Sequence, residues 1–409
     1  MNGRNTAVIG AGAAGMTAAI FAAKSGSRVT VFEKNSKIGR KLCITGKGRC
    51  NLTNNCDAKT VIANTPTNGR FLYSALDRFS PADTMSFFEE NGLPLKTERG
   101  NRVFPVSDRA YDVADTLLRV SRREGVSIVF EPVKDILVRD GRVSGLVTAS
   151  QSLSFDKIII ACGGRSYPLT GSTGDGYTFA GRLGHTIMPL KPSLVPLETV
   201  EMIDNEADRL LIKNAALTVC DGKNGGKRIY TDFGELQFMR YGVSGAIVLS
   251  ASSHIREMEE GRWHLSIDLK PALSAEKLDA RMLREISARR TETLPQLMRS
   301  LLPAGMVKMF IRMSGVPSSR ICSEITRAER RRIVALLKDL PLTVKGFRPI
   351  EEAIVTSGGV SVKEIDPKTM ESKIVKGLYF AGEVIDVDAY TGGFNLQCAF
   401  STGVLAGEN

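Results

Sequence analysis

The segment Thr6-Ala-Val-Ile-Gly10-Ala-Gly12-Ala-Ala-Gly15 decides the fold of this chain. Its short apolar run ends in Gly-x-Gly-x-x-Gly, and an alanine-rich stretch to Ser25 follows, which predicts a strand, a tight turn and a helix. In such a turn the first glycine permits the bend, the second lets the backbone approach a pyrophosphate, and the third allows close packing of helix on strand. The segment therefore predicts a dinucleotide-binding βαβ unit.

The residues that follow complete this unit. Val29 and Val31 alternate in a second predicted strand that ends at Glu33, 23 positions after Gly10. A carboxylate at this point can accept hydrogen bonds from an adenosine ribose. Because FAD and NAD present the same ADP half to a protein, the fingerprint does not separate the two.

A basic stretch follows directly. Between Lys34 and Asn55 there are six basic residues and no acidic one, interleaved with Gly39, Gly46 and Gly48. We expect a glycine-rich loop whose amides wrap a diphosphate and whose cations neutralise it. A solvated basic surface loop is the alternative.

A second strand-to-helix entry lies near the end of the sequence. Residues 377–383 predict a short strand that ends in Gly382 and Glu383, and Gly392-Gly393 open a helix rich in small residues. A helix N-terminus favours the negative charge that a flavin gathers on reduction, which indicates FAD and not a passing NAD. Between the two halves, residues 158–164 predict a buried strand that ends in a glycine turn. This strand either adds a third contact to the cofactor or is an ordinary sheet strand.

The composition restricts the class of protein to which this chain can belong. The 409 residues are 43% hydrophobic and 24% charged, which is typical of a globular protein of two to three domains. The seven cysteines form no CxxC pair, and three histidines cannot build a metal cluster, so we expect no metal site. With neither a signal-peptide core nor a long apolar run, a cytoplasmic protein without a membrane partner is expected.

The positive charge is unevenly distributed. The net charge is +11; residues 1–60 carry ten basic and two acidic side chains, and residues 281–345 carry fourteen and five. A solvated basic face is the favoured interpretation of the second region, since no recognised RNA or DNA module accompanies it. An RNA-binding flavoprotein remains an alternative.

At this point the sequence resembles a known family, the flavoproteins that include the aminoacetone oxidase-like enzymes and the bacterial 3-dehydro-bile acid reductases. The resemblance spans nearly the whole chain. Its carriers are the N-terminal fingerprint, the block from Gly39 to Asn54 (GRKLCITGKGRCNLTN), the block 171–176 (GSTGDG) and the segment 379–386 (YFAGEVID) with its glycine helix.

The resemblance implies an α/β fold. It consists of a discontinuous Rossmann-like FAD-binding domain (1–190 and 341–409), an inserted mostly-β domain (191–275) and a small helical cap (276–340), with FAD bound non-covalently. The patterns agree, because residues 191–275 contain short alternating stretches and helix-compatible runs broken by prolines follow. The residues that we expect to bind FAD are Gly10, Gly12, Ala13, Ala14, Gly15, Glu33, Lys34, Arg40, Lys41, Thr45, Gly46, Gly48, Arg49, Cys50, Asn51, Val133, Gly163, Gly382, Glu383, Gly393, Phe394, Asn395 and Leu396.

One part of the insert departs from the family pattern. Members usually have a Thr-His pair before a Gly-x-Ser-Gly sequence, whereas here Met239 and Arg240 precede Tyr241-Gly-Val-Ser-Gly. Histidine-assisted chemistry is therefore not expected there. Residues 127–138 are expected to add a strand to the FAD sheet, and the resemblance implies that the backbone of Val133 lies against adenine.

The leading functional hypothesis is a reductase that passes hydride from NAD(P)H through FAD to an activated C=C bond, such as the enone of a 3-oxo bile acid. Candidate groups for the carbonyl oxygen or for protonation are Arg240, Tyr241, Tyr167 and Tyr390, each next to a motif expected near the flavin. The basic cap is suited to steering a small anionic substrate, and nucleic acid is not favoured as a partner. The alternatives are an oxidase of a small amine that uses O2, and the RNA-binding flavoprotein. The oligomeric state stays open.

Overall fold

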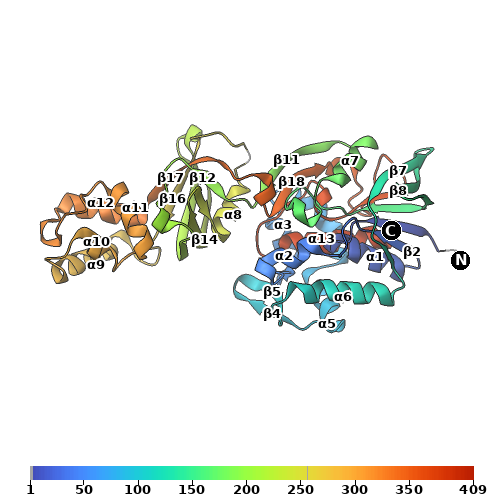
Figure 1. Cartoon of the computed structure of the whole chain (residues 1–409), viewed down its shortest axis with the longest axis horizontal. Coiled ribbons are helices and arrows are strands. Elements are labelled where there is room, and N and C mark those ends of the chain that lie inside the picture. The colour runs from blue at the N-terminus through green and yellow to red at the C-terminus, as the bar shows by residue number, and fades with distance from the viewer. Residues whose placement is uncertain (1–2, 256) are drawn as a thin grey trace. The chain divides into compact units, whose positions relative to one another are not determined.

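The computed structural model describes residues 3–255 and 257–409. Within it the chain divides into two compact units, shown as ribbons in Figure 1. Unit 1 consists of Met1–Ser193 and Ile350–Asn409, and unit 2 is the continuous segment Leu194–Pro349.

The centre of unit 1 is a parallel sheet of five strands. The strand order is β19-β10-β1-β2-β6, and the first helix, α1 (Ala13–Lys24), follows β1 as the glycine pattern predicts. The order places β1 between β10 and β2, so the glycine turn lies in the middle of the sheet. The strands are β1 (Asn5–Ile9), β2 (Arg28–Phe32), β6 (Ser127–Val129), β10 (Lys157–Ile160) and β19 (Leu378–Phe380).

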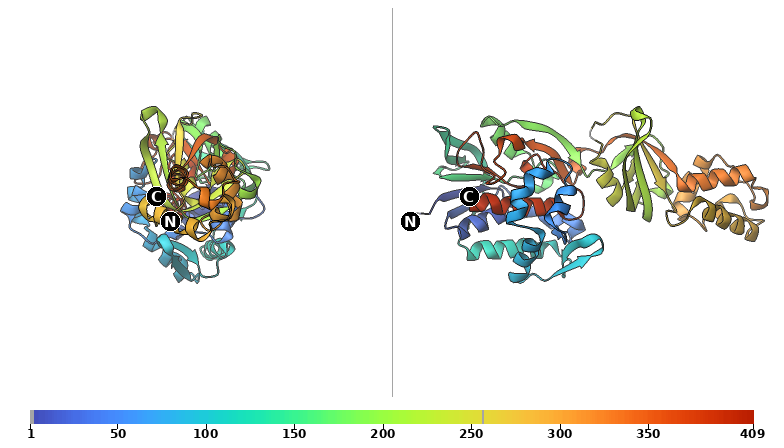
Figure 2. Two further views of the ribbon diagram at one scale, coloured as in Figure 1. Left: turned by 90° about the vertical axis from the view of Figure 1, so that its left-hand side faces the viewer. Right: turned by 180° about the vertical axis from the view of Figure 1, so that it is seen from behind.

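The helix α13 (Phe394–Glu408) packs along α1 (Figures 1 and 2). Small residues make this contact close. A Cβ atom on Gly403 would lie 2.6 Å from the carbonyl oxygen of Ala14, and one on Gly407 would lie 2.5 Å from that of Ala18. The first and the last helix of unit 1 therefore form one buried layer.

Smaller sheets and helices complete unit 1. Residues 127–138 add a strand to the parallel sheet as expected, but this strand is only β6, and Val133 begins a separate antiparallel sheet. The remaining strands are β3 (Thr53–Asn54), β4 (Leu95–Glu98), β5 (Arg102–Pro105), β7 (Val133–Arg139), β8 (Arg142–Thr148), β9 (Ser152–Ser154), β11 (Ile187–Ser193) and β18 (Val355–Val360). The helices are α2 (Arg40–Gly48), α3 (Ala58–Ala63), α4 (Tyr73–Arg78), α5 (Pro81–Glu90), α6 (Ala110–Arg123) and α7 (Asp175–Arg182).

Unit 2 is a closed antiparallel barrel with attached helices. The strand order is β12-β15-β14-β13-β16-β17, and residues such as Leu217, Leu236 and Ile267 fill a separate core. The strands are β12 (Leu197–Thr199), β13 (Leu211–Asp221), β14 (Lys227–Met239), β15 (Gly242–Ser244), β16 (Trp263–Asp268) and β17 (Leu340–Phe347). The helices are α8 (Ala246–Ser252), α9 (Ala275–Ala288), α10 (Leu294–Met298), α11 (Ala304–Ser314) and α12 (Arg327–Lys338).

The observed division differs from the expected boundaries at one place. We assigned residues from 341 onward to the FAD domain, but β17 pairs with β12 and β16 and so closes the barrel. The second crossing between the units therefore falls after Pro349, and the expected segments 191–275 and 276–340 lie almost entirely in one unit. Within the described ranges, no helix is both long and apolar enough to cross a bilayer.

Candidate dinucleotide site

The N-terminus of α1 has the geometry of an anion site. Gly10 has a φ of +105°, and a Cβ on Gly15 would lie 1.8 Å from the carbonyl oxygen of Gly10, so both positions need glycine for the fold itself. A Cβ on Gly12, in contrast, would meet no atom of the described residues within 4 Å. Gly12 precedes the helix, and no described side chain caps the amides of Ala13 and Ala14. Open space thus lies where a phosphate would approach these amides.

Glu33 lies directly after β2 and is 8% exposed. Its Oε2 accepts a hydrogen bond from the amide of Ala11 at 2.9 Å, and its Oε1 accepts one from the amide of Asn35 at 2.8 Å. These bonds hold the carboxylate beside the glycine turn. This is the position from which a carboxylate can bind a ribose.

The basic stretch is not the loop that we expected, because Arg40 to Ile44 are helical and only the end of α2 is irregular. Gly46, Lys47 and Gly48 all have left-handed φ values, of 56°, 59° and 84°. Cys50, whose amide donates to the carbonyl oxygen of Thr45, is left-handed as well. This turn positions Asn51, whose side-chain Oδ1 is buried and finds no hydrogen-bond partner among the described residues. A buried acceptor without a partner is costly unless a ligand or water donates to it.

The second helix N-terminus is also shaped by glycine. Gly393 has a φ of +97°, and a Cβ there would lie 2.3 Å from the carbonyl oxygen of Thr53. The side chain of Asn395 holds the preceding turn, because it donates to the carbonyl oxygen of Ala389 and accepts from that residue's amide. Phe394 is buried and Leu396 is half-buried.

Two more glycine positions belong to strand ends of the parallel sheet. Gly163 follows β10 with a φ of +72°. Gly382 follows β19 with a φ of +75°, and a Cβ there would lie 2.7 Å from Cβ of Ala14, so it lets this chain segment reach the start of α1. Val133 is half-buried at the first position of β7.

Three of the six cations of residues 34–49, Lys34, Lys41 and Arg49, have carboxylate partners, contrary to the expectation that the whole basic stretch is available to a diphosphate. Lys34 Nζ lies 2.7 Å from Asp175, and the guanidinium of Arg49 pairs with Glu98 and with Asp108. Arg40 donates to Asn35 Oδ1 at 2.8 Å. The carboxylate partners come from distant segments of the sequence, so the acid-free run did not reveal them.

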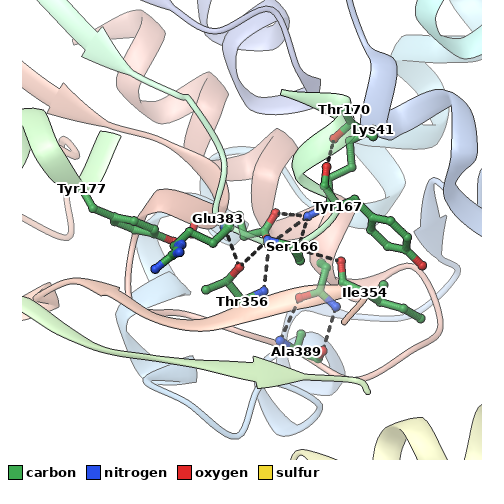
Figure 3. Close-up of polar contacts among 11 residues, drawn as sticks. Lys41, Ser166, Tyr167, Thr170, Tyr177, Ile354, Thr356, Glu383 and Ala389 are labelled. Carbon is green, nitrogen blue, oxygen red and sulfur yellow. Dashed lines mark hydrogen bonds and ion pairs between the residues drawn. The ribbon is translucent and has the colours of Figure 1, made fainter. Parts of the chain in front are cut away.

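Lys41 and Glu383, two of the predicted site residues, meet directly (Figure 3). Lys41 Nζ lies 2.7 Å from Glu383 Oε2 and 2.6 Å from Ser166 Oγ. Glu383 Oε1 also accepts the amide of Thr356 at 2.8 Å. Our sequence reasoning missed Ser166 and Thr356. The only sequence signal for Thr356 was the pair Gly163-Gly164. Glycine is needed at position 164 because a Cβ there would lie 2.4 Å from Thr356 Oγ1.

The four candidate catalytic residues fall into two pairs. Tyr167 and Tyr390 lie in unit 1, the first half-buried with a φ of 53° and the second with its amide bonded to the carbonyl oxygen of Asn64. Burial, assisted by the charge of Glu352, raises the pKa of the Tyr167 phenol. Arg240 and Tyr241 lie in unit 2, in the turn between β14 and β15.

The pair in unit 2 already has contacts of its own. The amide of Arg240 donates to Asp208 Oδ1 at 3.0 Å. The ring of Tyr241 lies 4.6 Å from the guanidinium carbon of Arg348. Both contacts hold the turn on the barrel.

The cysteines near the site are poor nucleophiles. Burial raises the pKa of Cys50, Cys162 and Cys398 to about 12 in each case, so these thiols stay protonated at neutral pH. In the described part of the chain, no group of three or more His, Cys, Asp and Glu side chains could hold a metal ion.

These residues fit FAD. Gly12 leaves room for a phosphate at the amides of α1, and the Glu33 carboxylate lies where it can accept hydrogen bonds from a ribose. The buried Oδ1 of Asn51 lacks a hydrogen-bond donor among the described residues. A flavin ring carries such an N–H donor. The backbone of α1, more than the paired cations, is thus equipped to hold the diphosphate.

Comparison with known proteins agrees with an FAD site in this chain. Residues 4–409 match the family described as HI0933-like protein Rossmann domain. The chain belongs to this family. It is 33% identical over 408 residues to the 3-dehydro-bile acid delta(4,6)-reductase of Clostridium scindens, covering 98% of this chain and 97% of that protein. It is 31% identical over 410 residues to the ribosomal RNA dihydrouridine synthase of Haemophilus influenzae, covering 97% and 95%.

Solved structures show the same fold. The 3-ketosteroid delta1-dehydrogenase of Sterolibacterium denitrificans aligns with a TM-score of 0.53 at 14% identity, covering 100% of this chain and 99% of that one. The 3-ketosteroid-delta4-(5alpha)-dehydrogenase of Rhodococcus jostii aligns with a TM-score of 0.52 at 14% identity, covering 99% and 95%. The predicted fold class is confirmed: a Rossmann-type FAD-binding domain with an inserted mostly-β domain. Site and family together make the protein an FAD-dependent oxidoreductase.

Proposed function

We propose that the protein reduces a C=C bond conjugated to a carbonyl group, with NAD(P)H as the reductant and a small anionic enone as the substrate. The observation that carries this proposal is the likeness over 98% of the chain to a relative named as a reductase of double bonds at positions 4 and 6 of a 3-dehydro-bile acid. In the overall reaction, NAD(P)H supplies a hydride and water supplies a proton. The C=C bond becomes a CH–CH bond, and NAD(P)⁺ is released.

Bound FAD would supply the hydride transfer itself, so the protein has few chemical tasks. The amides at the start of α1 bind the diphosphate, and Glu33 orients the ribose. The start of α13 favours negative charge at the position that it faces.

A proton donor is needed as well, and Tyr167 is our candidate. Its pKa is raised by burial, so the phenol keeps its proton throughout the neutral range. It follows the Gly163-Gly164 turn and lies next to Ser166, which is bonded to Lys41 and Glu383 (Figure 3). Tyr167 would hold the carbonyl oxygen of the substrate or protonate its α-carbon.

A second candidate substrate is uridine in RNA. Uracil also has a C=C bond conjugated to a carbonyl, so the same chemistry would produce dihydrouridine, and a relative of nearly full coverage is named as a ribosomal RNA dihydrouridine synthase. The specific observation in its favour is an exposed basic surface on the helices of unit 2. Its exposed cations, which have no carboxylate within ion-pair distance among the described residues, are Lys277, Arg284, Arg290, Arg299, Arg327, Arg331 and Arg332.

Anaerobic stopped-flow absorbance separates these substrates from a third alternative, the amine oxidase. The holoenzyme is first mixed with NADH or NADPH, and the reduced enzyme is then mixed with a 3-oxo bile acid enone, with ribosomal RNA or with O2. Bleaching by the nicotinamide followed by rapid reoxidation with the enone supports the proposal. Reduction by aminoacetone, without bleaching by either nicotinamide, would overturn it.

Two variants sharpen this experiment. Tyr167→Phe is expected to slow reoxidation by the enone by about 10²-fold or more and to leave flavin reduction unchanged. Tyr73→Phe, on the exposed surface of α4, is the matched control. If RNA is the better oxidant, Arg331→Ala with Arg332→Ala should weaken RNA retention and reduce its salt dependence.

A further inference from the structure

A cavity of about 510 Å³ lies beside the dinucleotide site in unit 1. Its walls come from the segment 37–44, from the start of α6, from Glu351, and from Tyr167 with the turn that follows it. A volume of this size suits a small ligand and not only a few waters.

The cavity lies on a different face of α2 from the network of Lys41 and Glu383. Successive helical residues are turned by about 100°. Arg40 and Ile44, four positions apart, therefore share the face that lines the cavity, whereas Lys41 points to Glu383 and Ser166. The cavity thus adjoins that network without including Lys41 or Glu383, and Tyr167, which follows Ser166 in the sequence, lies in its wall.

Its lining combines apolar surface with positive charge. Leu169 and Tyr111, which are 88% and 62% exposed, give the lining apolar surface that a ligand can cover. Lys37 and Arg40 add two exposed cations, against the single carboxylate of Glu351. This combination suits a ligand with a flat apolar part and a negative group.

A nicotinamide dinucleotide needs a binding site separate from that of FAD. The part of the chain that the structure describes contains one parallel sheet with a glycine-rich dinucleotide turn, and FAD uses it. We propose that the cavity binds the adenosine phosphate end of the nicotinamide dinucleotide, with Lys37 and Arg40 at the phosphates and the ring of Tyr111 against adenine. This inference rests on the proposed function, because it requires NADH or NADPH to be the reductant.

The test measures the concentration dependence of flavin reduction by NADH under anaerobic conditions. The variants are Lys37→Glu and Tyr111→Ala, and the control is Arg139→Glu, an exposed charge reversal on the hairpin of β7 and β8. Each variant should raise the apparent Kd for NADH about tenfold or more and leave the limiting rate unchanged. ADP-ribose should compete with NADH in the wild type and should lose affinity for both variants.

Two further readouts separate the possible failures. Reoxidation of the dithionite-reduced enzyme by an enone and the FAD content should be the same in all variants. If Lys37→Glu and Tyr111→Ala keep the wild-type Kd for NADH, or lose FAD instead, the cavity is not the nicotinamide site and the proposed reaction is unaffected. If neither NADH nor NADPH reduces the wild-type flavin, both the reductant and this inference are wrong.

Discussion

Residues 34–49 of unit 1 and residues 275–338 of unit 2 are both rich in lysine and arginine, but their cations have different surroundings. In the first region, Lys34, Lys41 and Arg49 each have a carboxylate partner from a distant segment. In the second, pairs such as Arg330 with Asp279 coexist with exposed cations such as Arg331 and Arg332. A count of charges along the sequence therefore says little about which charges remain available to a ligand.

Because Lys34, Lys41 and Arg49 are engaged by carboxylates, we expect the backbone of α1 to make the main contribution to binding the diphosphate. Gly12→Val should then raise the Kd for FAD by at least about 100-fold, because the new side chain fills the open space in front of the helix amides. Lys34→Met should change the Kd by less than about threefold. Titration of FAD into apo-protein, followed by flavin fluorescence, measures both.

A matched glycine serves as the control for this comparison. Gly15→Ala should lower the melting temperature of the apo-protein, since its Cβ would collide with the carbonyl oxygen of Gly10, whereas Gly12→Val should leave that temperature nearly unchanged. A larger loss of FAD affinity in Lys34→Met than in Gly12→Val would show that charge dominates.

The next largest effect is expected on the free energy of unfolding when the ion pair of Lys41 and Glu383 is broken. Their side chains are 22% and 19% exposed, so Lys41→Met leaves a mostly buried carboxylate without its cation. We expect a loss of about 2–3 kcal/mol in the free energy of unfolding, measured by urea titration. Arg78→Met, which breaks the more exposed pair with Glu408, should cost no more than about 1 kcal/mol. Equal losses would contradict the distinction between enclosed and exposed pairs.

Lys157 belongs to neither region, and it is buried without a carboxylate within ion-pair distance among the described residues. It is 2% exposed, donates to the carbonyl oxygen of Gly407 at 2.9 Å, and has a pKa lowered by burial to about 7. Between about pH 7 and the ordinary lysine value, the unfolded chain binds more protons than the native one. The free energy of unfolding should therefore rise with pH in this range, by up to about 1.4 kcal/mol per pH unit.

Lys157→Met removes the titrating group and should flatten this slope. Urea titrations at several pH values from 6.5 to 10 on the wild type and the variant provide the measurement. An identical slope in the two proteins would mean that Lys157 does not cause it.

The smallest effect is expected on the exposed basic surface. Arg331→Ala with Arg332→Ala should keep the free energy of unfolding within about 0.5 kcal/mol of the wild type and leave the Kd for FAD unchanged. Both side chains are exposed, and neither has an ion-pair partner among the described residues. Thermal melts and FAD titrations check this. A larger loss of stability would place these residues among the structural cations, like those of unit 1.

Local patterns made much of the fold predictable. The strand, turn and helix at Gly10 to Gly15 follow from three glycines whose roles are steric. The strand before Gly382 and the helix entry at Gly393 could be found in the same way. Ion-pair and hydrogen-bond partners from distant segments of the chain could not be predicted from the sequence. Asp175 for Lys34, and Thr356 for Glu383, depend on tertiary contacts that no local spacing encodes.

The boundary of the barrel was missed for a similar reason. Residues 340–347 form a strand that would suit either unit, and only its pairing with β12 and β16 assigns it to unit 2. The helix over Arg40 to Ile44 was missed because the following glycines suggested a loop. For Arg240 and Tyr241, whose roles were inferred from motif neighbours, the function stays a prediction.

The strand order of the parallel sheet has a consequence for the newly made protein. β19 lies next to β10, and α13 covers α1, yet both elements follow the whole of unit 2 in the chain. At about 5–20 residues per second, a ribosome needs on the order of ten seconds to make Leu194–Pro349. During that time the nascent N-terminal half has an open sheet edge and an uncovered helix. The barrel can close first, so we expect FAD capture to be the final step in biogenesis.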